Sequence, residues 1–297
     1  SHMDTVTPGI GVKPIVDEAN GIIKSDGTTI LGSDDKAGIA AILEGLRYIN
    51  ENNIEHTDIQ VVFSICEECG LVGAKNLDYG KIDSEYAFIL DSGGSPGEII
   101  VKAPAQDVIN VKILGKTAHA GLEPEAGISA IMVAARAIEN MNLLRIDEET
   151  TANIGIINGG TATNIVTGEV NIIAEARSLK ENKLDVQTKH MVETFEKAAK
   201  DFGAQIEIDV NRAYTPIDVS EDSEIIKLAK KAFSNLGIEG HTESTGGGSD
   251  TNILSKNGIE AITLGIGMKN AHTLSEHIAI KDLYDSAKMV VEIIKEA

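Results

Sequence analysis

The stretch LGSDDKAGIAA, Leu31 to Ala41, places two adjacent carboxylates at a turn in front of an amphipathic segment. An aspartate that precedes a helix is an ordinary N-cap, so Asp34 or Asp35 can start a helix here. The other carboxylate then needs a partner elsewhere in the chain. The apolar side chains that recur behind this turn at helical spacing are Ile39, Ile42, Leu43, Leu46 and Ile49.

Two apolar segments downstream are typical of buried strands. They are IQVVFSI, Ile59 to Ile65, and YAFIL, Tyr86 to Leu90. Because helix and strand alternate, the pattern predicts an α/β sheet with helices on its faces. Ligands bind at the carboxyl ends of the strands in such sheets. The polar runs CEECG and DSGG follow these two segments, so we expect a site at that edge.

The middle of the chain follows a different pattern. Its strands and helices are expected in the order β-α-β-β-α-β, which is the ferredoxin-like order. We therefore expect an inserted ferredoxin-like α+β domain at residues 105–213, and an α/β domain formed by residues 1–104 and 214–297. The segments that carry the pattern are 107–114, 127–141, 151–158, 168–178, 186–200 and 205–210. Helix and strand alternate again afterwards, up to a final helix from Ile280.

The charge balance excludes several classes of partner. The 297 residues carry a net charge of −20, which disfavours nucleic acid and anionic membranes and favours metal cations. No apolar run approaches the length of a membrane span. With only two cysteines there is no disulfide framework, so a cytoplasmic protein is expected.

Oxygen and imidazole ligands gather at loops and strand ends of the α/β part. Two histidines with several carboxylates suit a pair of zinc ions, or manganese or cobalt in place of zinc. One aspartate of the Asp34–Asp35 pair could bridge two ions while its neighbour holds the turn. The adjacent Glu67 and Glu68 could divide labour, one binding metal and the other taking a proton from water. The candidates are His2, Asp4, Asp34, Asp35, Glu67, Glu68, Asp91 and His272.

Each of these signals also has a simpler interpretation. Taken alone, the two aspartates are a helix cap, the two glutamates are solvated surface, and HMD is a vector remnant. His272 and His277 can each be ordinary loop histidines. Cys66 and Cys69 lack the second pair that a structural zinc ribbon needs, which favours packing residues. The run TGGGSD, Thr245 to Asp250, lacks the ending of a phosphate loop, which favours a tight turn or close approach to a substrate.

Nine motifs in order resemble those of one enzyme family. They are SHMDTV, GSDDKAG, EECG, LDSGG, GKTAHAG, GGTATNIV, AEARS, GGGSD and NAHTLSEH. Together they are similar to the peptidase T-like branch of the acetylornithine deacetylase/carboxypeptidase G/peptidase T family of co-catalytic zinc hydrolases. The resemblance covers nearly the whole chain. It implies a catalytic α/β domain with a mixed sheet, interrupted by a ferredoxin-like lid.

The resemblance also implies a role for each matching residue. The metal ligands would be His2, Asp34, Glu68, Asp91 and His272, with Asp34 bridging both ions and followed by Asp35 through a strained peptide bond. Asp4 would orient the His2 imidazole, and Glu67 would be the general base. In the lid, His119 would stabilise the oxyanion, Arg177 would grip a substrate carboxylate, and Asn164 would be a further polar contact.

The implied reaction is hydrolysis of an amide bond in short peptides, above all release of the amino-terminal residue from tripeptides. A hydroxide held between two zinc ions would attack the carbonyl, and Glu67 would return the proton to the leaving amine. Lid closure could gate turnover. A deacylase or carboxypeptidase acting on N-acyl amino acids, and a non-catalytic binding protein with the same fold, are the alternatives.

Members of the family carry a further helix and strands before the motif that begins this chain. We therefore expect either a fragment or an ordered structure that starts here, with native residues at its start. A fragment would have lost part of the sheet that supports His2, so a catalytically impaired fragment is a further alternative. In some relatives the lid pairs two subunits, so a homodimer through residues 105–213 is a further expectation.

Overall fold

The structure is a computed structural model that describes residues 1–297. Its contacts divide the chain into two compact units, each with its own hydrophobic core. Unit 1 consists of Ser1–Ala103 and Ile217–Ala297, and unit 2 is the intervening segment Pro104–Pro216. None of the helices combines the length and the apolar composition needed to cross a membrane.

Unit 1 is built on a mixed five-stranded sheet. Its strands follow the order β10-β4-β12-β3, and β11 also pairs with β4. Strand β12 runs parallel to β3 and antiparallel to β4, so the expected α/β class with a mixed sheet is confirmed. The strands are β3 (Tyr86–Ser92), β4 (Glu98–Ala103), β10 (Ile217–Asp218), β11 (His241–Ser244) and β12 (Glu260–Gly265).

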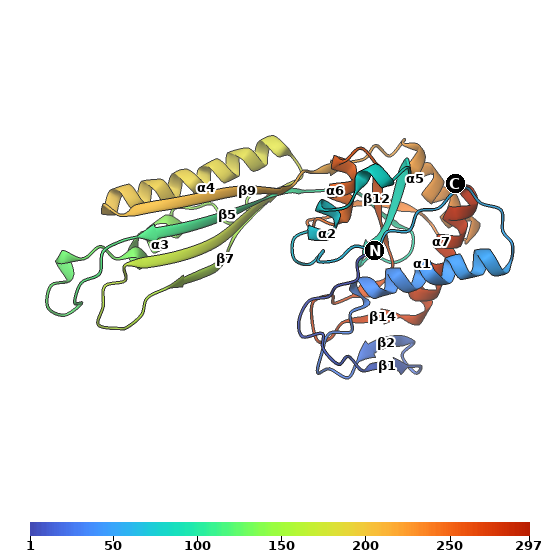
Figure 1. Ribbon diagram of the computed structural model, residues 1–297, viewed down its shortest axis with the longest axis horizontal. Coiled ribbons are helices and arrows are strands. Elements are labelled where there is room, and N and C mark those ends of the chain that lie inside the picture. Colours follow the sequence, from blue (N-terminus) through green and yellow to red (C-terminus); the bar gives the residue numbers. More distant parts are fainter. The chain divides into compact units, whose positions relative to one another are not determined.

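Helices cover both faces of this sheet (Figure 1). Helices α1, α5 and α7 share a core with Ile262 of β12, whereas α6 packs its Leu254 with Ala261 of the same strand. Since successive strand residues point to opposite faces, α6 lies on the face opposite the other three. The helices are α1 (Ser33–Glu51), α2 (Val72–Lys75), α5 (Glu224–Asn235), α6 (Asp250–Lys256) and α7 (Ile280–Glu296).

A second, antiparallel sheet in unit 1 was not predicted. Its strand order is β1-β2-β14-β13, and all of its strands are short. Strands β13 and β14 pair with each other and thereby anchor both ends of the segment 270–276, which carries His272. The strands are β1 (Pro14–Asp17), β2 (Ile22–Ser25), β13 (Met268–Lys269) and β14 (His277–Ala279).

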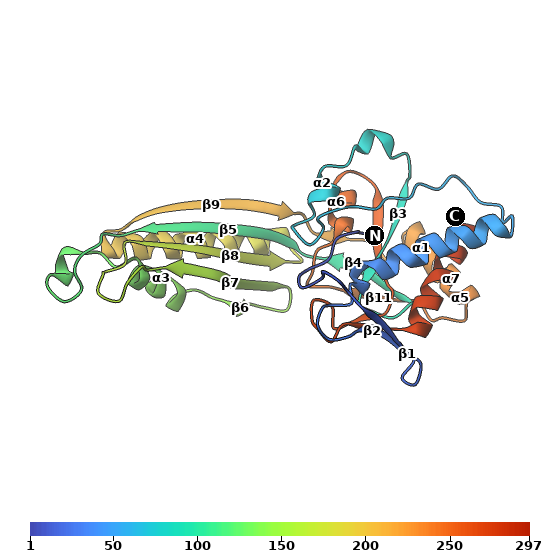
Figure 2. The same ribbon diagram turned by 60° about the horizontal axis from the view of Figure 1, so that its bottom comes forward.

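Unit 2 has the ferredoxin-like arrangement. Its sheet order is β6-β7-β8-β5-β9, and every neighbouring pair is antiparallel, as Figure 2 shows. The two helices cover one face, where Val133 and Phe195 pack on Ile109. The elements are β5 (Ala105–Leu114), α3 (Ala130–Glu139), β6 (Leu144–Arg145), β7 (Thr150–Gly159), β8 (Glu169–Ser178), α4 (Glu181–Phe202) and β9 (Gln205–Tyr214).

The expected strand at Ile59–Ile65 is wrong. Residues 54–63 have no regular secondary structure, and Ser64 pairs only through a single bridge to His2. Ile59 and Val61 are 36% and 42% exposed. The segment 57–62 and strand β3 both line a cavity of about 450 Å³. Because the cavity separates them, the backbone of this segment forms no ladder hydrogen bonds with β3.

Candidate metal centre

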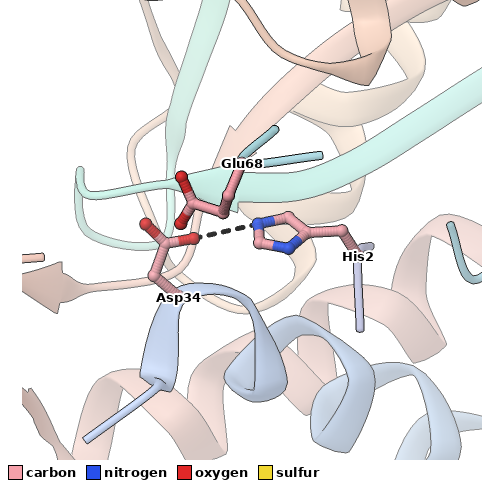
Figure 3. Close-up of side chains that lie close together, drawn as sticks. All are labelled: His2, Asp34 and Glu68. Carbon is pink, nitrogen blue, oxygen red and sulfur yellow. Dashed lines mark hydrogen bonds and ion pairs between the residues drawn. The ribbon is translucent and has the colours of Figure 1, made fainter. Parts of the chain in front are cut away.

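Asp34 lies between two histidines that are far apart in the sequence. Its Oδ1 is 3.1 Å from Nε2 of His2, and its Oδ2 is 3.2 Å from Nε2 of His272. Nε2 of His272 is also 2.8 Å from Oε1 of Glu68, and Nε2 of His2 is 3.7 Å from Oδ1 of Asp91. Figure 3 shows His2, Asp34 and Glu68 converging, and their ligating atoms all lie within 4.8 Å of one another.

His2 is held by backbone pairing. It forms a parallel bridge with Ser64, because the Met3 amide donates to the Ser64 carbonyl at 2.9 Å and the Ser64 amide donates to the Ser1 carbonyl at 3.1 Å. The Ser64 hydroxyl in turn donates to the carboxylate of Asp250. The His2 side chain is therefore buried at a fixed place beside the start of α1.

Neither aspartate of the opening motif caps α1, so that interpretation was wrong. The N-cap is Gly32, in the left-handed region at φ 74°, and no side chain of the helix caps it. Asp34 faces the two histidines, while Oδ2 of the fully buried Asp35 accepts the backbone N–H of His2 at 3.0 Å. The peptide bond between the two aspartates is cis.

Asp4 links the His2 segment to the two adjacent glutamates. Its carboxylate accepts the backbone N–H groups of Glu67 at 3.0 Å and Glu68 at 3.1 Å. Nδ1 of His2 lies 3.1 Å from the Asp4 carbonyl oxygen and 3.5 Å from its carboxylate. One side chain thus lies next to the imidazole and fixes the turn that carries the glutamates.

The carboxylates of Asp34, Glu68 and Asp91 form no ion pair with lysine or arginine. The ion pairs of Asp34, Glu68 and Asp91 are with histidine alone. Burial raises the pKa of Asp91 well above its usual range, and burial with the nearby Asp34 raises the pKa of Glu68. The pKa of His2, which burial alone would lower, is raised to about 10 by Asp34, Asp91 and the neighbouring acids.

These features fit divalent cations. Oδ1 of Asp35 and Oδ1 of Asp250 are buried without any hydrogen-bond partner, so the cluster holds more acceptors than the chain supplies donors. Buried charge of one sign is costly unless it is paired or binds metal. Two imidazole nitrogens with several carboxylate oxygens form a donor set suited to zinc, manganese or cobalt. A second possible ligand group joins His2, Asp35 and Asp91.

Glu67 differs from its neighbour Glu68. Its carboxylate forms no hydrogen bond or ion pair within the chain, although the backbone of the residue is fixed by Asp4. Burial raises the pKa of Glu67 to about 8, with the charges of Asp250 and Glu68 acting in the same direction. A carboxylate without a partner and with a raised pKa is suited to exchanging a proton.

Two of the residues expected in the lid lie together in unit 2. His119 forms a bridge with Ile165, and the Ala120 amide donates to the carbonyl of Asn164 at 2.9 Å. Both side chains are exposed. Nδ1 of His119 accepts the backbone N–H groups of Gly121 and Leu122, each at 3.2 Å. In the neutral ring the proton is therefore on Nε2, which is left as a donor.

Arg177 lies on β8 and is oriented by an acid on the same strand. Its Nε donates to Oε1 of Glu175 at 3.1 Å, and its Nη2 donates to Oε2 at 3.0 Å. The side chain of Gln106 donates to the same Glu175 carboxylate at 2.5 Å. The guanidinium is thus held in a fixed orientation on the sheet face that the helices leave open.

Sequence reasoning missed two acids next to the centre. Asp250, from the glycine-rich motif, binds the Ser64 hydroxyl, and Glu276 binds the start of α1. The only available signal for Glu276 was its position four residues after His272 in HTLSE. His277, on β14, contacts the Ser275 carbonyl oxygen and no residue of the centre. Cys66 and Cys69 are free thiols.

The chain matches known proteins over its whole length. The model of peptidase family M20/M25/M40 matches residues 1–296. The uncharacterized protein YqjE of Bacillus subtilis is 49% identical over all of this chain and 80% of its own length.

Two solved structures are similar along the entire chain. The structure of aminopeptidase PepT from Bacillus cereus has a TM-score of 0.88 and 47% identity, and it covers 100% of this chain and 79% of that protein. A tripeptidase from Staphylococcus aureus has a TM-score of 0.94 and 46% identity, covering 99% and 79%. The resemblance inferred from the nine motifs is confirmed: this chain belongs to peptidase family M20/M25/M40 and is a metal-dependent peptidase.

Proposed function

We propose that this peptidase releases the amino-terminal residue from short peptides, tripeptides above all, and that it uses two divalent ions. The observation that carries the proposal is Asp34, whose two carboxylate oxygens each face a different histidine, at 3.1 and 3.2 Å. A carboxylate in this position can be shared by two ions. The aminopeptidase and tripeptidase names of the two similar structures support the substrate class.

The two ligand sets share Asp34. His2 and Asp91 would complete one set, and Glu68 and His272 the other, with zinc as the expected metal and manganese or cobalt as alternatives. Divalent ions bound there would polarise the scissile carbonyl and lower the pKa of water. Asp4 keeps the His2 ring oriented, as partners of ligating histidines do.

Glu67 is assigned the proton transfers. Its carboxylate has no partner in the chain, and its turn is fixed through Asp4. In the proposed reaction Glu67 accepts the proton of the attacking water and delivers it to the nitrogen of the leaving amine. General acid–base catalysis of this kind contributes about 10²- to 10⁴-fold to a rate.

His119, Asn164 and Arg177 are assigned to the substrate. Nε2 of His119 is free to donate to the oxyanion because Nδ1 already accepts two backbone N–H groups. The guanidinium of Arg177, oriented by Glu175, suits the terminal carboxylate of a short peptide. Asn164, adjacent in space to the His119 segment, is assigned a polar contact.

The test is a matched pair of substrates. The zinc-loaded protein is assayed with a free tripeptide and with the same tripeptide N-acetylated, and the released residue is identified by mass spectrometry. We expect release of the amino-terminal residue from the free peptide, loss of activity in excess chelator, and recovery with zinc, manganese or cobalt.

Three outcomes would contradict parts of the proposal. Cleavage that persists in excess chelator would show that the reaction does not need a metal ion. Preference for the acetylated peptide would favour a deacylase, and release of the carboxyl-terminal residue would favour a carboxypeptidase. In both of the last two cases the metal centre would stand and the substrate class would change.

A further inference from the structure

Glu276 is a buried acid that binds the backbone of the shared ligand. Its side chain is 1% exposed. Oε2 accepts the backbone N–H of Gly32 at 2.7 Å, and Oε1 accepts both the Ser33 hydroxyl at 2.6 Å and the Asp34 N–H at 3.0 Å. Three donors from consecutive residues thus converge on one carboxylate.

The start of α1 cannot satisfy these donors by itself. Gly32 has no side chain to cap the helix, and Asp34 and Asp35 have non-helical backbone angles. The first N–H groups of a helix need partners from outside when no local cap exists. Glu276 supplies them from a segment 242 residues away, and its hydrogen bonds are of the stronger, charge-assisted kind.

The same short segment carries the ligand His272. The Glu276 amide donates to the Thr273 carbonyl at 3.1 Å, and the Thr273 hydroxyl donates to the Asn270 carbonyl at 2.8 Å. The segment is therefore internally bonded from Asn270 to Glu276. At one end it presents His272 to the Asp34 carboxylate, and at the other end it holds the Asp34 amide.

We propose that Glu276 is a positioning residue that sets the separation between Asp34 and His272, and thereby the affinity of the centre for the ion that these two residues share with Glu68. The proposal rests on the two-ion function proposed above. The Glu276 carboxylate contacts Gly32, Ser33 and Asp34 and is not among the expected ligands. It acts through the backbone of one ligand and the segment of another.

The test measures zinc affinity rather than turnover. Zinc is titrated calorimetrically into the chelator-treated and desalted chain, for the wild type and for Glu276→Gln. Glutamine keeps the volume but offers one acceptor oxygen and places an amide NH₂ group, which is itself a donor, against one or more of the three donors. We expect about 10- to 100-fold weaker binding of one of the two ions, the range typical for partners that orient ligands.

Three further variants and one control identify the cause. His272→Ala, which removes a ligand of that ion, should weaken the same binding event as Glu276→Gln, whereas Asp91→Ala should weaken the other. Ser33→Ala removes one of the three donors and should give a smaller loss in a well-folded protein. Asp107→Asn is the matched control, since Asp107 is a buried acid of unit 2 held by Arg212 and Thr188. This variant should lower the melting temperature without changing zinc affinity.

The outcomes separate the two proposals. Two ions in the wild type with unchanged affinity in both Glu276→Gln and Ser33→Ala would overturn the positioning role and leave the proposed function intact. Equal weakening of both ions in Glu276→Gln would mean that Glu276 acts only through the shared Asp34, and it would overturn the claim that Glu276 sets the separation between Asp34 and His272. A wild type that binds no zinc would overturn the two-ion function and this inference together.

Discussion

Oδ1 of Asp4 lies 3.0 Å from the backbone nitrogen of Glu67. The Asp4 carboxylate thus connects the segment that carries His2 to the turn that carries Glu67. The other oxygen of Asp4 accepts the neighbouring amide of Glu68 at 3.1 Å. Asp4 therefore fixes two positions at once, the His2 ring and the pair of glutamates. This arrangement makes Asp4 a sensitive position for mutation.

Asp4→Ala should lower both zinc affinity and kcat/KM, each by about 10- to 100-fold, because the backbone N–H groups of Glu67 and of the expected ligand Glu68 lose their carboxylate partner. The Asp4 carbonyl oxygen, which contacts Nδ1 of His2, remains in this variant. Asp4→Asn keeps one acceptor oxygen and should fall between the wild type and Asp4→Ala. Calorimetry and steady-state kinetics on one preparation measure the two effects. If Asp4→Ala lowered kcat alone with unchanged zinc affinity, the Asp4 carboxylate would not be needed to position Glu68 for zinc.

Glu67→Gln should lower kcat by about 10²- to 10⁴-fold and leave the zinc content at the wild-type value. The reason is that the Glu67 carboxylate forms no hydrogen bond or ion pair with the expected metal ligands. Glu68→Gln is the matched comparison at the next residue. That variant should lose zinc as well as activity, because Glu68 lies against His272. Metal analysis beside peptide kinetics checks both, and unchanged hydrolysis by Glu67→Gln would show that another group takes the proton.

His119→Ala should lower kcat by about 10²- to 10³-fold with little change in zinc content, because the loss of one oxyanion donor acts on turnover. His190→Ala is the control in the same unit. Nε2 of His190 accepts the Asn142 amide at 3.0 Å, so its loss should reduce stability and spare turnover. Equal losses of metal and activity in His119→Ala would instead make His119 a structural residue.

The chelator-treated protein should become less stable as the pH rises from about 5 to 9. The folded-state pKa of Glu67 is raised from 4.5 to about 8, and that of His2 is raised from 6.5 to about 10. In both cases the folded state binds more protons than the unfolded state between the two values, so stability falls with pH in that interval. Zinc should reverse the trend, because ligands bind metal in their deprotonated form.

Melting temperatures at several pH values, with chelator and with zinc, measure this dependence. The gain in melting temperature from zinc should be larger at pH 8 than at pH 5.5. A chelator-treated protein whose melting temperature rises across this range would mean that the folded cluster does not retain its protons.

The local sequence patterns predicted most helices and strands, but they did not predict the elements that depend on partners distant in the sequence. The periodic residues behind Asp35 and the six segments of unit 2 became helices and strands as expected. The segment at Ile59–Ile65 has the composition of a strand, yet only Ser64 forms a bridge, to His2, and no ladder continues from it. The sequence patterns did not predict strand β4, although its Ile99 is fully buried in the core that the sheet shares with α1, α5 and α7.

In the candidate site, too, residues within local motifs were predicted, whereas contacts between distant segments were not. The motifs predicted residues that lie close together in the structure, from His2 and Asp34 to His272, because each motif contains its own candidate ligand. The supporting contacts could not be predicted, since Glu276 meets Asp34 across 242 residues and Asp250 meets Ser64 across 186. A sequence pattern gives residue types at close spacing, whereas these hydrogen bonds depend on how the finished fold brings loops together.

The distribution of ligands along the chain has a consequence for biosynthesis. His272 follows Glu68 by 204 residues, and all of unit 2 is translated between them. Unit 2 has its own core and can fold before the segment that carries His272 has been synthesised. A metal centre that includes His272, as proposed, would therefore be completed only after the ribosome has released the segment that carries this residue, and metal loading would be a late event in the maturation of the chain.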